Sequence, residues 1–137
     1  MKWLNKSGKE FSFADKRYLI NWDKPAPSKG SQEVKDFLGA NYRFWTWFEE
    51  YRVPGTKLKV DFLSTTSKVA IEFHGRQHSQ FVKHWHGSKS GFLGHIKRDV
   101  KKEELLLKNG FCFIELYDED LELLSKSWFE SRLAGQV

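Results

Sequence analysis

The stretch from Lys57 to His78, KLKVDFLSTTSKVAIEFHGRQH, constrains the fold more than any other part of the chain. Apolar and polar residues alternate in both of its halves, which is the period of half-buried β-strands. The halves are separated by Ser64-Thr65-Thr66-Ser67, residues that are typical of a turn. We therefore expect two strands joined as a β-hairpin, with Gly75 ending the second strand.

Two acids of this hairpin, Asp61 and Glu72, are the candidates for a functional pair. A turn of two or four residues pairs Leu63 with Lys68 and Asp61 with Ala70, and it puts both acids on one face, diagonally across the strands. Diagonal neighbours lie about 7–8 Å apart, so the two carboxylates can share a cation. A three-residue turn would move one acid to the opposite face. On the residues alone, solvent-facing acids paired with nearby lysines are an equally good interpretation.

Composition limits the class of protein. The 137 residues, 39% hydrophobic and 16% aromatic, predict one domain with its own core rather than a disordered chain. No apolar run reaches the ~18 residues of a membrane span, and the first residues lack the apolar segment of a secretory signal. The single Cys112 lies in an apolar run and cannot build a disulfide framework. These features predict an intracellular, cytoplasmic protein.

Positive charge is concentrated at the start of the sequence. The formal net charge is +5, and residues 1–30 contribute +4 of it, from seven Lys or Arg against three Asp or Glu. Aromatic rings alternate with these cations, a composition suited to phosphate contact and base stacking. We interpret residues 1–30 as a basic, aromatic and irregular N-terminal arm, with Lys16 and Arg17 as DNA contacts, ahead of one domain over residues 31–137. Coverage of one edge of the core by the same rings is an equally good alternative.

Further elements are predicted on both sides of the hairpin. They are, in chain order, a helix that Ser28 or Ser31 caps, a second helical piece over Tyr42 to Tyr51, a helix from about Lys97 to Asn109 that stops at Gly110, a mostly buried strand over residues 111–116, and an amphipathic helix that Asp118-Glu119-Asp120 caps.

Residues 75–95 form a long polar loop after the hairpin. A loop of this length in a compact domain is usually functional or mobile, and its basic residues indicate phosphate contact through Arg76, Lys83 and Lys89. Its histidines suggest zinc as an alternative, although further Cys or His residues at finger-like spacing are missing. A zinc-organised interaction protein would use His84, His86 and His95.

Four motifs in this order resemble the PD-(D/E)XK nuclease superfamily, in the branch of very-short-patch-repair-like and related homing endonucleases. They are Ser31-Gln32-Glu33, Val60-Asp61-Phe62, Ile71 to His78, and Arg98-Asp99 through Leu106 to Gly110. The resemblance covers about residues 28–120. It implies an α/β fold with a restriction-endonuclease-like core, in which a mixed β-sheet is flanked by helices in the order α-β-β-β-α-β. It also implies hydrolysis of DNA phosphodiester bonds with Mg²⁺, for which Mn²⁺ can substitute.

The resemblance also implies roles for individual residues. Asp61 and Glu72 would hold the metal with the backbone carbonyl of Phe73, and Glu33 would support it through water. The implied catalytic set is Asp61, Glu72, His74, His78, Asp99 and Glu33. Further DNA contacts would come from Lys97 and Arg98, beside the arm and loop residues named above.

One position departs from the superfamily. A lysine often stands two residues after the second acid, or an acid in this branch, whereas this chain has His74 there. A neutral imidazole can position water or accept its proton near pH 7, but it supplies no fixed charge. The general base therefore stays open between His74 and His78, and we rank His78 first because it matches the Gly-x-x-His motif.

The chemistry fits a metal-dependent DNA endonuclease. A phosphodiester resists hydroxide because both are anionic, and a hard cation held by oxygen ligands removes that repulsion. One site per chain would favour a homodimer for cutting both strands. The rivals are a catalytically silent DNA-binding module of the same fold and the zinc-organised protein.

Overall fold

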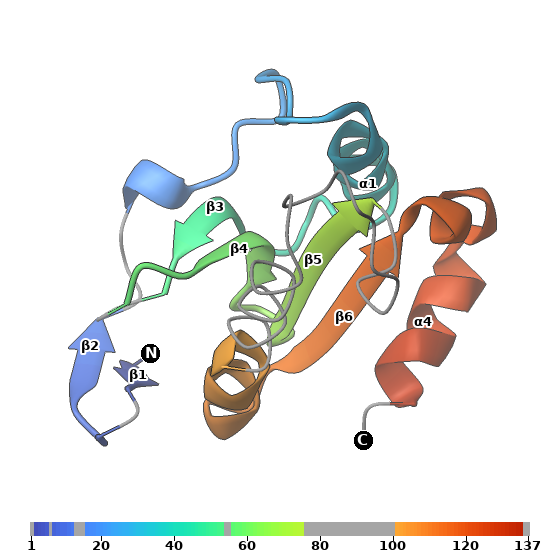
Figure 1. The fold of residues 1–137 in the computed structure, drawn as a ribbon. Helices are drawn as coiled ribbons and strands as arrows, with labels where there is room; N and C mark the ends of the chain where they lie inside the picture. Colours follow the sequence, from blue (N-terminus) through green and yellow to red (C-terminus); the bar gives the residue numbers. More distant parts are fainter. Residues whose placement is uncertain (1, 6, 13–15, 54–55, 76–100, 136–137) are drawn as a thin grey trace, which may run out of the picture.

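A computed structural model shows a four-stranded mixed β-sheet with helices on both faces (Figure 1). It describes residues 2–5, 7–12, 16–53, 56–75 and 101–135. The strands, in spatial order, are β3 (Trp47–Arg52), β4 (Lys59–Ser64), β5 (Val69–Gly75) and β6 (Cys112–Tyr117). The first three are antiparallel neighbours, whereas β5 and β6 run parallel. The predicted α/β class with a mixed sheet is therefore confirmed.

Helix α1 (Lys29–Asn41) covers one face of the sheet. Ser28, one of the two predicted caps, is its N-cap, and its hydroxyl accepts a hydrogen bond from the Ser31 N–H at 3.1 Å. Val34 and Leu38, one helical turn apart, are fully buried. They share a core cluster with the sheet residues Phe62, Ile71 and Ile114.

A second helix covers the opposite face. Residues 101–108 are helical, and Leu105 and Leu106 belong to the core cluster that contains the sheet residues Leu63, Ala70 and Phe113. The chain leaves this helix at Gly110, whose φ of 81° suits glycine. The predicted stop at Asn109-Gly110 is therefore confirmed, while the predicted start near Lys97 lies outside the described residues.

The predicted second helical piece over Tyr42 to Tyr51 is wrong, because residues 47–52 form strand β3. Tyr42 is the C-cap of α1, so the helix ends where the second piece was expected to begin. Trp47 and Phe48 are buried in the clusters on opposite faces of the sheet. A run of aromatic residues fits a half-buried strand as well as a helix, and the tertiary contacts decide between them.

The predicted hairpin is present, but its register is shifted by two residues. Leu63 pairs with Ala70 and Phe62 with Ile71, so Leu63 is not opposite Lys68. The turn keeps four residues but lies one position later in the chain, at residues 65–68, since Ser64 pairs with Val69 and Lys68 takes a positive φ of 53° within the turn. An even shift leaves every side chain on its predicted face.

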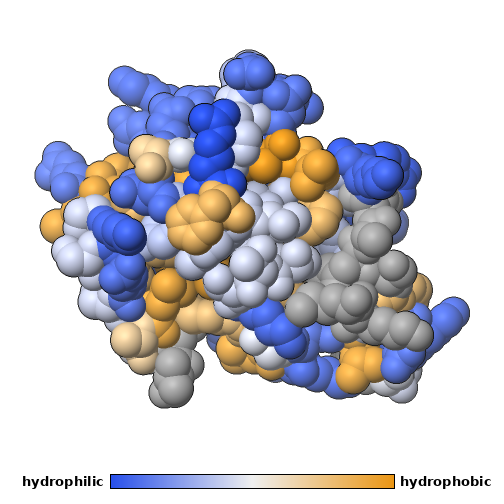
Figure 2. Space-filling model, turned by 180° about the vertical axis from the view of Figure 1, so that it is seen from behind, coloured by the Kyte–Doolittle hydropathy of each residue, from blue (hydrophilic) through white to orange (hydrophobic). Residues whose placement is uncertain are grey.

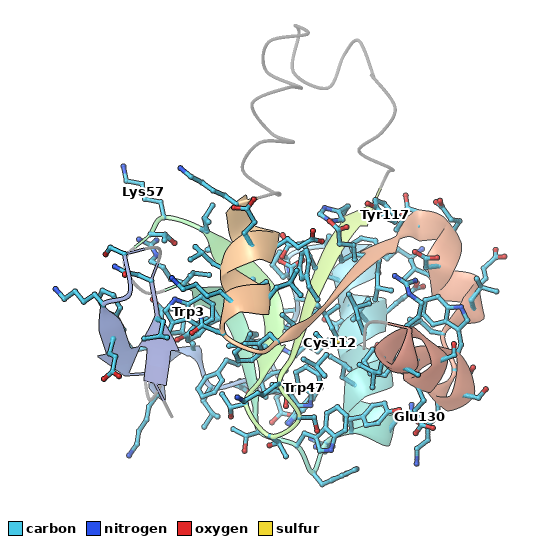
Figure 3. All side chains as sticks on the ribbon, turned by 90° about the horizontal axis from the view of Figure 1, so that it is seen from below. Trp3, Trp47, Lys57, Cys112, Tyr117 and Glu130 are labelled. Carbon is cyan, nitrogen blue, oxygen red and sulfur yellow. The ribbon has the colours of Figure 1, made fainter. Side chains whose placement is uncertain are left out.

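The N-terminal residues are more regular than predicted. Strands β1 (Lys2–Leu4) and β2 (Glu10–Ser12) form a two-stranded antiparallel sheet, followed by the short helix η1 (Lys16–Tyr18). Trp3 is fully buried and lies between this hairpin and helical residues 101–108 (Figure 3). The Asn109 side chain accepts from the Leu4 N–H at 2.6 Å and donates to the Leu4 carbonyl at 2.9 Å. This part of the first segment is thus joined to the core.

The chain ends in two helical pieces rather than the one predicted. The 3-10 helix η2 (Asp118–Leu123) comes first, and the carboxylate of Asp120 accepts from the Tyr117 N–H at its start. Helix α4 (Lys126–Ala134) follows, with Ser125 as its N-cap. Phe129 of α4 is fully buried on the α1 side of the sheet.

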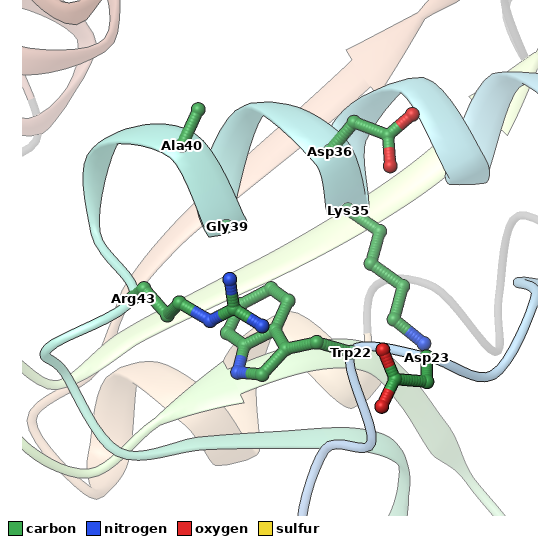
Figure 4. Close-up of a pocket in the computed structure, with 7 residues that line it drawn as sticks. All are labelled: Trp22, Asp23, Lys35, Asp36, Gly39, Ala40 and Arg43. Atoms are coloured by element: carbon green, nitrogen blue, oxygen red, sulfur yellow. The ribbon is translucent and has the colours of Figure 1, made fainter.

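A pocket of about 370 Å³ lies along α1, on its side facing residues 20–24 (Figure 4). Trp22 packs against Gly39, where a Cβ would come within 3.2 Å of the ring, and the Arg43 guanidinium lies over the indole. Lys35 is buried beside them and binds Glu49 at 2.7 Å. These contacts join the segment before α1 to the helix, and Lys35 joins the helix to strand β3.

The described surface is mainly hydrophilic. Figure 2 shows one face on which apolar side chains appear in small groups among polar ones. The large apolar side chains exposed among the described residues are Leu19, Phe44, Leu107 and Leu123. None of the helices in the described ranges has the length and apolar character needed to cross a bilayer.

Gly30→Ala is expected to destabilise the fold, because a Cβ at this position would lie 2.2 Å from the Phe73 ring. The ring or the first turn of α1 must move, and overpacking of this kind typically costs about 1–3 kcal/mol. Urea denaturation of both proteins measures the difference. Gly135→Ala is the matched control, since its Cβ would meet the nearest atom at an ordinary 3.5 Å. Equal effects of the two substitutions would contradict the expectation.

Candidate active site

The backbone ladder between β4 and β5 opens beside Asp61 and Glu72. Its last regular pair on this side is Phe62 with Ile71, and the same register continued by one residue places Asp61 opposite Glu72. Beyond that pair, carboxylates replace carbonyls as acceptors. The Asp61 N–H donates to Glu72 Oε2 at 3.3 Å, and the Phe73 N–H donates to Asp61 Oδ2 at 2.8 Å. The two acids are therefore held face to face between the strands, closer than the predicted diagonal.

Acids on the outer strands extend this pair into a row across the sheet. Glu115 of β6 is the register partner of Glu72, and the β3–β4 register places Glu50 opposite Asp61. Neighbouring strands lie about 4.8 Å apart, so one carboxylate from each strand follows the next. Glu50 is also close enough to Asp61 for its charge to raise the pKa of that carboxyl. We call Glu50, Asp61, Glu72 and Glu115 the acid row.

Glu50 reaches Asp61 through an unusual backbone conformation. Its φ is 48°, a value that non-glycine residues rarely adopt. Phe48 and Tyr51, three residues apart, consequently contribute to the same core cluster, although strict alternation would separate them. Strand β3 therefore changes its alternation at the point where it contributes to the acid row.

Burial and crowding make the central pair resist ionisation. Burial, together with the charges of Glu72 and Glu50, raises the pKa of Asp61 to about 8, while the hydrogen bond from the Phe73 N–H opposes the rise. Burial also raises the pKa of Glu72, although Lys102 acts against this. Two adjacent carboxylates out of water repel each other when both are charged. The pair therefore favours a bound proton or a bound cation.

Three basic side chains contact the acid row, and the longest of these contacts joins Lys59 Nζ to Glu50 Oε1 at 3.8 Å. Lys102, from the helix over residues 101–108, places its Nζ 2.8 Å from Glu72 Oε1 and is buried. His74 of β5 places its Nε2 3.1 Å from Glu115 Oε1, and its ring stacks on Tyr117. Three of the four acids of the row thus each have a basic partner.

The structure brings together three of the predicted catalytic residues. Asp61, Glu72 and His74 lie within the acid row or in contact with it, and Phe73 contributes its N–H to Asp61. Glu33 is exposed on α1, whose buried residues pack against the opposite face of the sheet from Lys102. Its role in supporting a metal stays a prediction.

The predicted DNA contacts are described only in part. Lys16 and Arg17 are both exposed on η1, and the Arg17 guanidinium lies over the Tyr18 ring. The other predicted functional residues lie outside the described residues: His78, Asp99, Arg76, Lys83, Lys89, Lys97, Arg98 and the zinc candidates His84, His86 and His95.

Three members of this site were missed from the sequence. Glu50 was missed because residues Tyr42 to Tyr51 were predicted to be helical. In a helix, Glu50 would have no partner across a β-sheet, so nothing linked it to Asp61. Glu115 carried a signal, because it interrupts the apolar run of residues 111–116. Lys102 carried a signal in its spacing, because it precedes Leu105 and Leu106 by three and four residues and so lies on the apolar face of its helix.

The acid row supplies oxygen ligands of the kind that hard divalent cations prefer. In the described part of the chain, no three His, Cys, Asp or Glu side chains are arranged to hold a metal ion by themselves. Magnesium is often bound through one or two carboxylates, with water and substrate phosphates completing its shell. The residues present fit that mode, with Asp61 and Glu72 as the two carboxylates.

Comparisons with known proteins give distant relatives. The chain is 26% identical over 98 residues to uncharacterized protein 033L of Invertebrate iridescent virus 3, which covers 68% of this chain and 50% of the relative. It is 32% identical over 59 residues to uncharacterized protein 307L of Invertebrate iridescent virus 6, covering 43% and 30% of the two chains. The matches thus span half of the first relative and less than a third of the second. No family model and no solved structure matches the chain.

Asp61→Asn is expected to make the metal-free protein less sensitive to rising pH. The pKa of Asp61 is about 8 in the folded state against an ordinary 3.8. Between these two pKa values the folded protein therefore keeps a proton that the unfolded chain has lost. The stability that Asp61 contributes is fully present below about pH 4 and is lost as pH rises through about 8. One pKa unit corresponds to about 1.4 kcal/mol. We expect the wild type to lose at least about 1.4 kcal/mol of unfolding free energy through this residue as pH rises, and Asp61→Asn to lack that loss.

Urea denaturation in EDTA, from about pH 5 to about pH 9, measures this effect. The free energy of unfolding of the wild type should fall over this range, and that of Asp61→Asn should fall less. Glu122→Gln, on an exposed residue of η2, is the control and should follow the wild type. Parallel profiles for wild type and Asp61→Asn would rule out the raised pKa.

Proposed function

We propose that this chain is a metal-dependent DNA endonuclease of the PD-(D/E)XK type, which hydrolyses phosphodiester bonds with Mg²⁺ held by Asp61 and Glu72. The observation that carries the proposal is the pair itself: two buried carboxylates face each other where the β4–β5 ladder opens, and burial raises the pKa of both. A bound cation would be favourable at such a pair, because it would relieve the repulsion between the two ionised carboxylates.

The order of the elements supports the proposed fold family. Helix α1, strands β3, β4 and β5, helical residues 101–108 and strand β6 follow one another as α-β-β-β-α-β. This is the order that the sequence resemblance implies, and β3 is the strand that was mistaken for a helix. The acids lie on the second and third of the three antiparallel strands. On this basis we propose a restriction-endonuclease-like core.

Metal chemistry would act at the central pair. A bound Mg²⁺ supplies a Lewis acid that neutralises a phosphate oxygen and lowers the pKa of bound water. Asp61 and Glu72 each contribute a carboxylate, and Glu50 adds negative charge from the neighbouring strand. The Phe73 carbonyl remains the proposed third protein ligand. Glu33 would act through water, as the resemblance implies.

His74 is held in a fixed orientation beside the pair. Its side chain is 4% exposed, its Nε2 is 3.1 Å from Glu115 Oε1, and its ring stacks on Tyr117. When Nε2 donates to Glu115 in the neutral tautomer, Nδ1 is the acceptor atom. Such an imidazole can orient a water molecule or take its proton. His74 therefore stays a candidate for the base beside His78.

Cleavage of supercoiled plasmid DNA tests the proposal. The wild type should nick the plasmid with Mg²⁺ or Mn²⁺ and not with EDTA. Asp61→Asn should abolish nicking while it keeps the fold and DNA binding, because it removes charge and little volume. Glu122→Gln, an exposed acid on η2, is the control and should cut normally.

Three results would count against the proposal. Binding of DNA without cleavage would favour the catalytically silent module, and unchanged nicking by Asp61→Asn would remove this residue from the site. Stoichiometric zinc in the purified protein would favour the interaction protein. A panel of linear, mismatched and four-way DNA then identifies the preferred substrate.

The two histidines are expected to differ in their effect on the rate. A general base contributes roughly 10²–10⁴-fold, and we expect His78→Ala to lower single-turnover cleavage by that factor, with His74→Ala causing a smaller loss. The measurement is the pH–rate profile of both variants at saturating Mg²⁺. A dead His74→Ala beside a normal His78→Ala would reverse the ranking and make His74 the base. Normal rates for both would make the two histidines structural.

A further inference from the structure

Lys102 places a positive charge on the acid row from the helical layer above the sheet. Its Nζ lies 2.8 Å from Glu72 Oε1, and its side chain is 9% exposed. It precedes Leu105 and Leu106 by three and four residues, so it lies on the same helix face as these core side chains. A lysine on this buried face must be desolvated, and a buried ion pair is rarely better for stability than an apolar replacement.

The contact fixes how the Glu72 carboxylate is turned. Oε1 accepts from Lys102, whereas Oε2 accepts from the Asp61 N–H. One oxygen is thus directed to the helix and the other to strand β4. Loss of the ammonium would leave Oε1 without this partner and free the carboxylate to rotate.

The contact also adds a positive charge beside the two acids, where an ion or a substrate phosphate would bind. Asp61 and Glu72 carry two negative charges when ionised, and Lys102 returns one positive charge. A divalent cation would therefore bring these three side chains to a net +1, and the neighbouring Glu50 would lower that total to zero. With a neutral Lys102, each total would be lower by one charge. Like charges a few ångströms apart repel each other more strongly in a buried site than in water, because the effective dielectric constant there is lower. The lysine therefore opposes cation binding and favours an anionic ligand.

We infer that Lys102 is a positioning residue of this site, which fixes the Glu72 carboxylate, weakens the affinity for a divalent cation and makes the loaded site one charge more positive toward a phosphodiester. The inference rests on the proposed function, since it concerns the same two acids. It predicts opposite changes in two measurable quantities, which a purely structural ion pair would not produce.

Binding of Mn²⁺ without DNA tests the inference, with free Mn²⁺ followed by its electron paramagnetic resonance signal. Lys102→Met keeps the length of the side chain and removes the charge, and it should bind Mn²⁺ about tenfold or more tightly than wild type. Lys102→Arg keeps the charge and should stay near wild type. Lys101→Met, on the exposed neighbouring residue, is the matched control. Lys102→Gln serves as a second neutral variant if Lys102→Met does not fold, as judged by circular dichroism.

Single-turnover cleavage gives the second readout. Lys102→Met should cut at least tenfold more slowly than wild type at saturating metal, although it binds the metal more tightly. If the wild type binds Mn²⁺ and folded Lys102→Met binds it no more tightly, the inference is overturned whatever the cleavage result. If the affinity rises but no DNA is cut by the wild type, the nuclease proposal fails and the role of Lys102 in cation binding stands. If the wild type does not bind Mn²⁺ at all, both are overturned.

Discussion

The hydrogen bonds that Asp61 and Glu72 accept from the backbone are the contacts on which the candidate site depends. They replace carbonyl acceptors at the point where β4 and β5 separate, so the same two side chains complete the sheet and carry the charge. Their burial is unfavourable for ionised carboxylates. The pair therefore favours a bound proton or cation, and Lys102 supplies a compensating positive charge to Glu72 from the adjacent layer.

The helices on the two faces of the sheet contribute different residues around this pair. On one face, α1 and α4 close an apolar cluster that includes Ile71, the neighbour of Glu72 in the chain. On the other face, the helix over residues 101–108 contributes both core leucines and the lysine that reaches the acids. Strand alternation lets adjacent residues serve core and site separately.

The hairpin and its acids could be predicted from the sequence because strand alternation is a local signal. Placing Asp61 and Glu72 on the same face required only an even number of residues in the turn. That prediction is therefore correct although the predicted register was wrong by two residues. Strand β3 could not be predicted in this way, because its aromatic run suits either secondary structure and the choice depends on contacts with distant residues. The error at β3 also concealed Glu50, whose relation to Asp61 exists only once the strands are paired. Lys102 is distinguished from its lysine neighbours by its position on the apolar face of its helix, where it is buried.

Two hydrogen bonds between the Asn109 side chain and the Leu4 backbone join residues that are 105 positions apart in the chain. Contacts of such long sequence separation are slow to form, because closing the long loop between their partners costs conformational entropy. During synthesis, Trp3 has to wait for the helix over residues 101–108 before its ring can be buried. The same helix brings Lys102 to the acids, so the burial of the Trp3 ring and the completion of the charged site both depend on this helix. A chain without residues 101–108 would leave both an exposed indole and two carboxylates without the Lys102 ammonium.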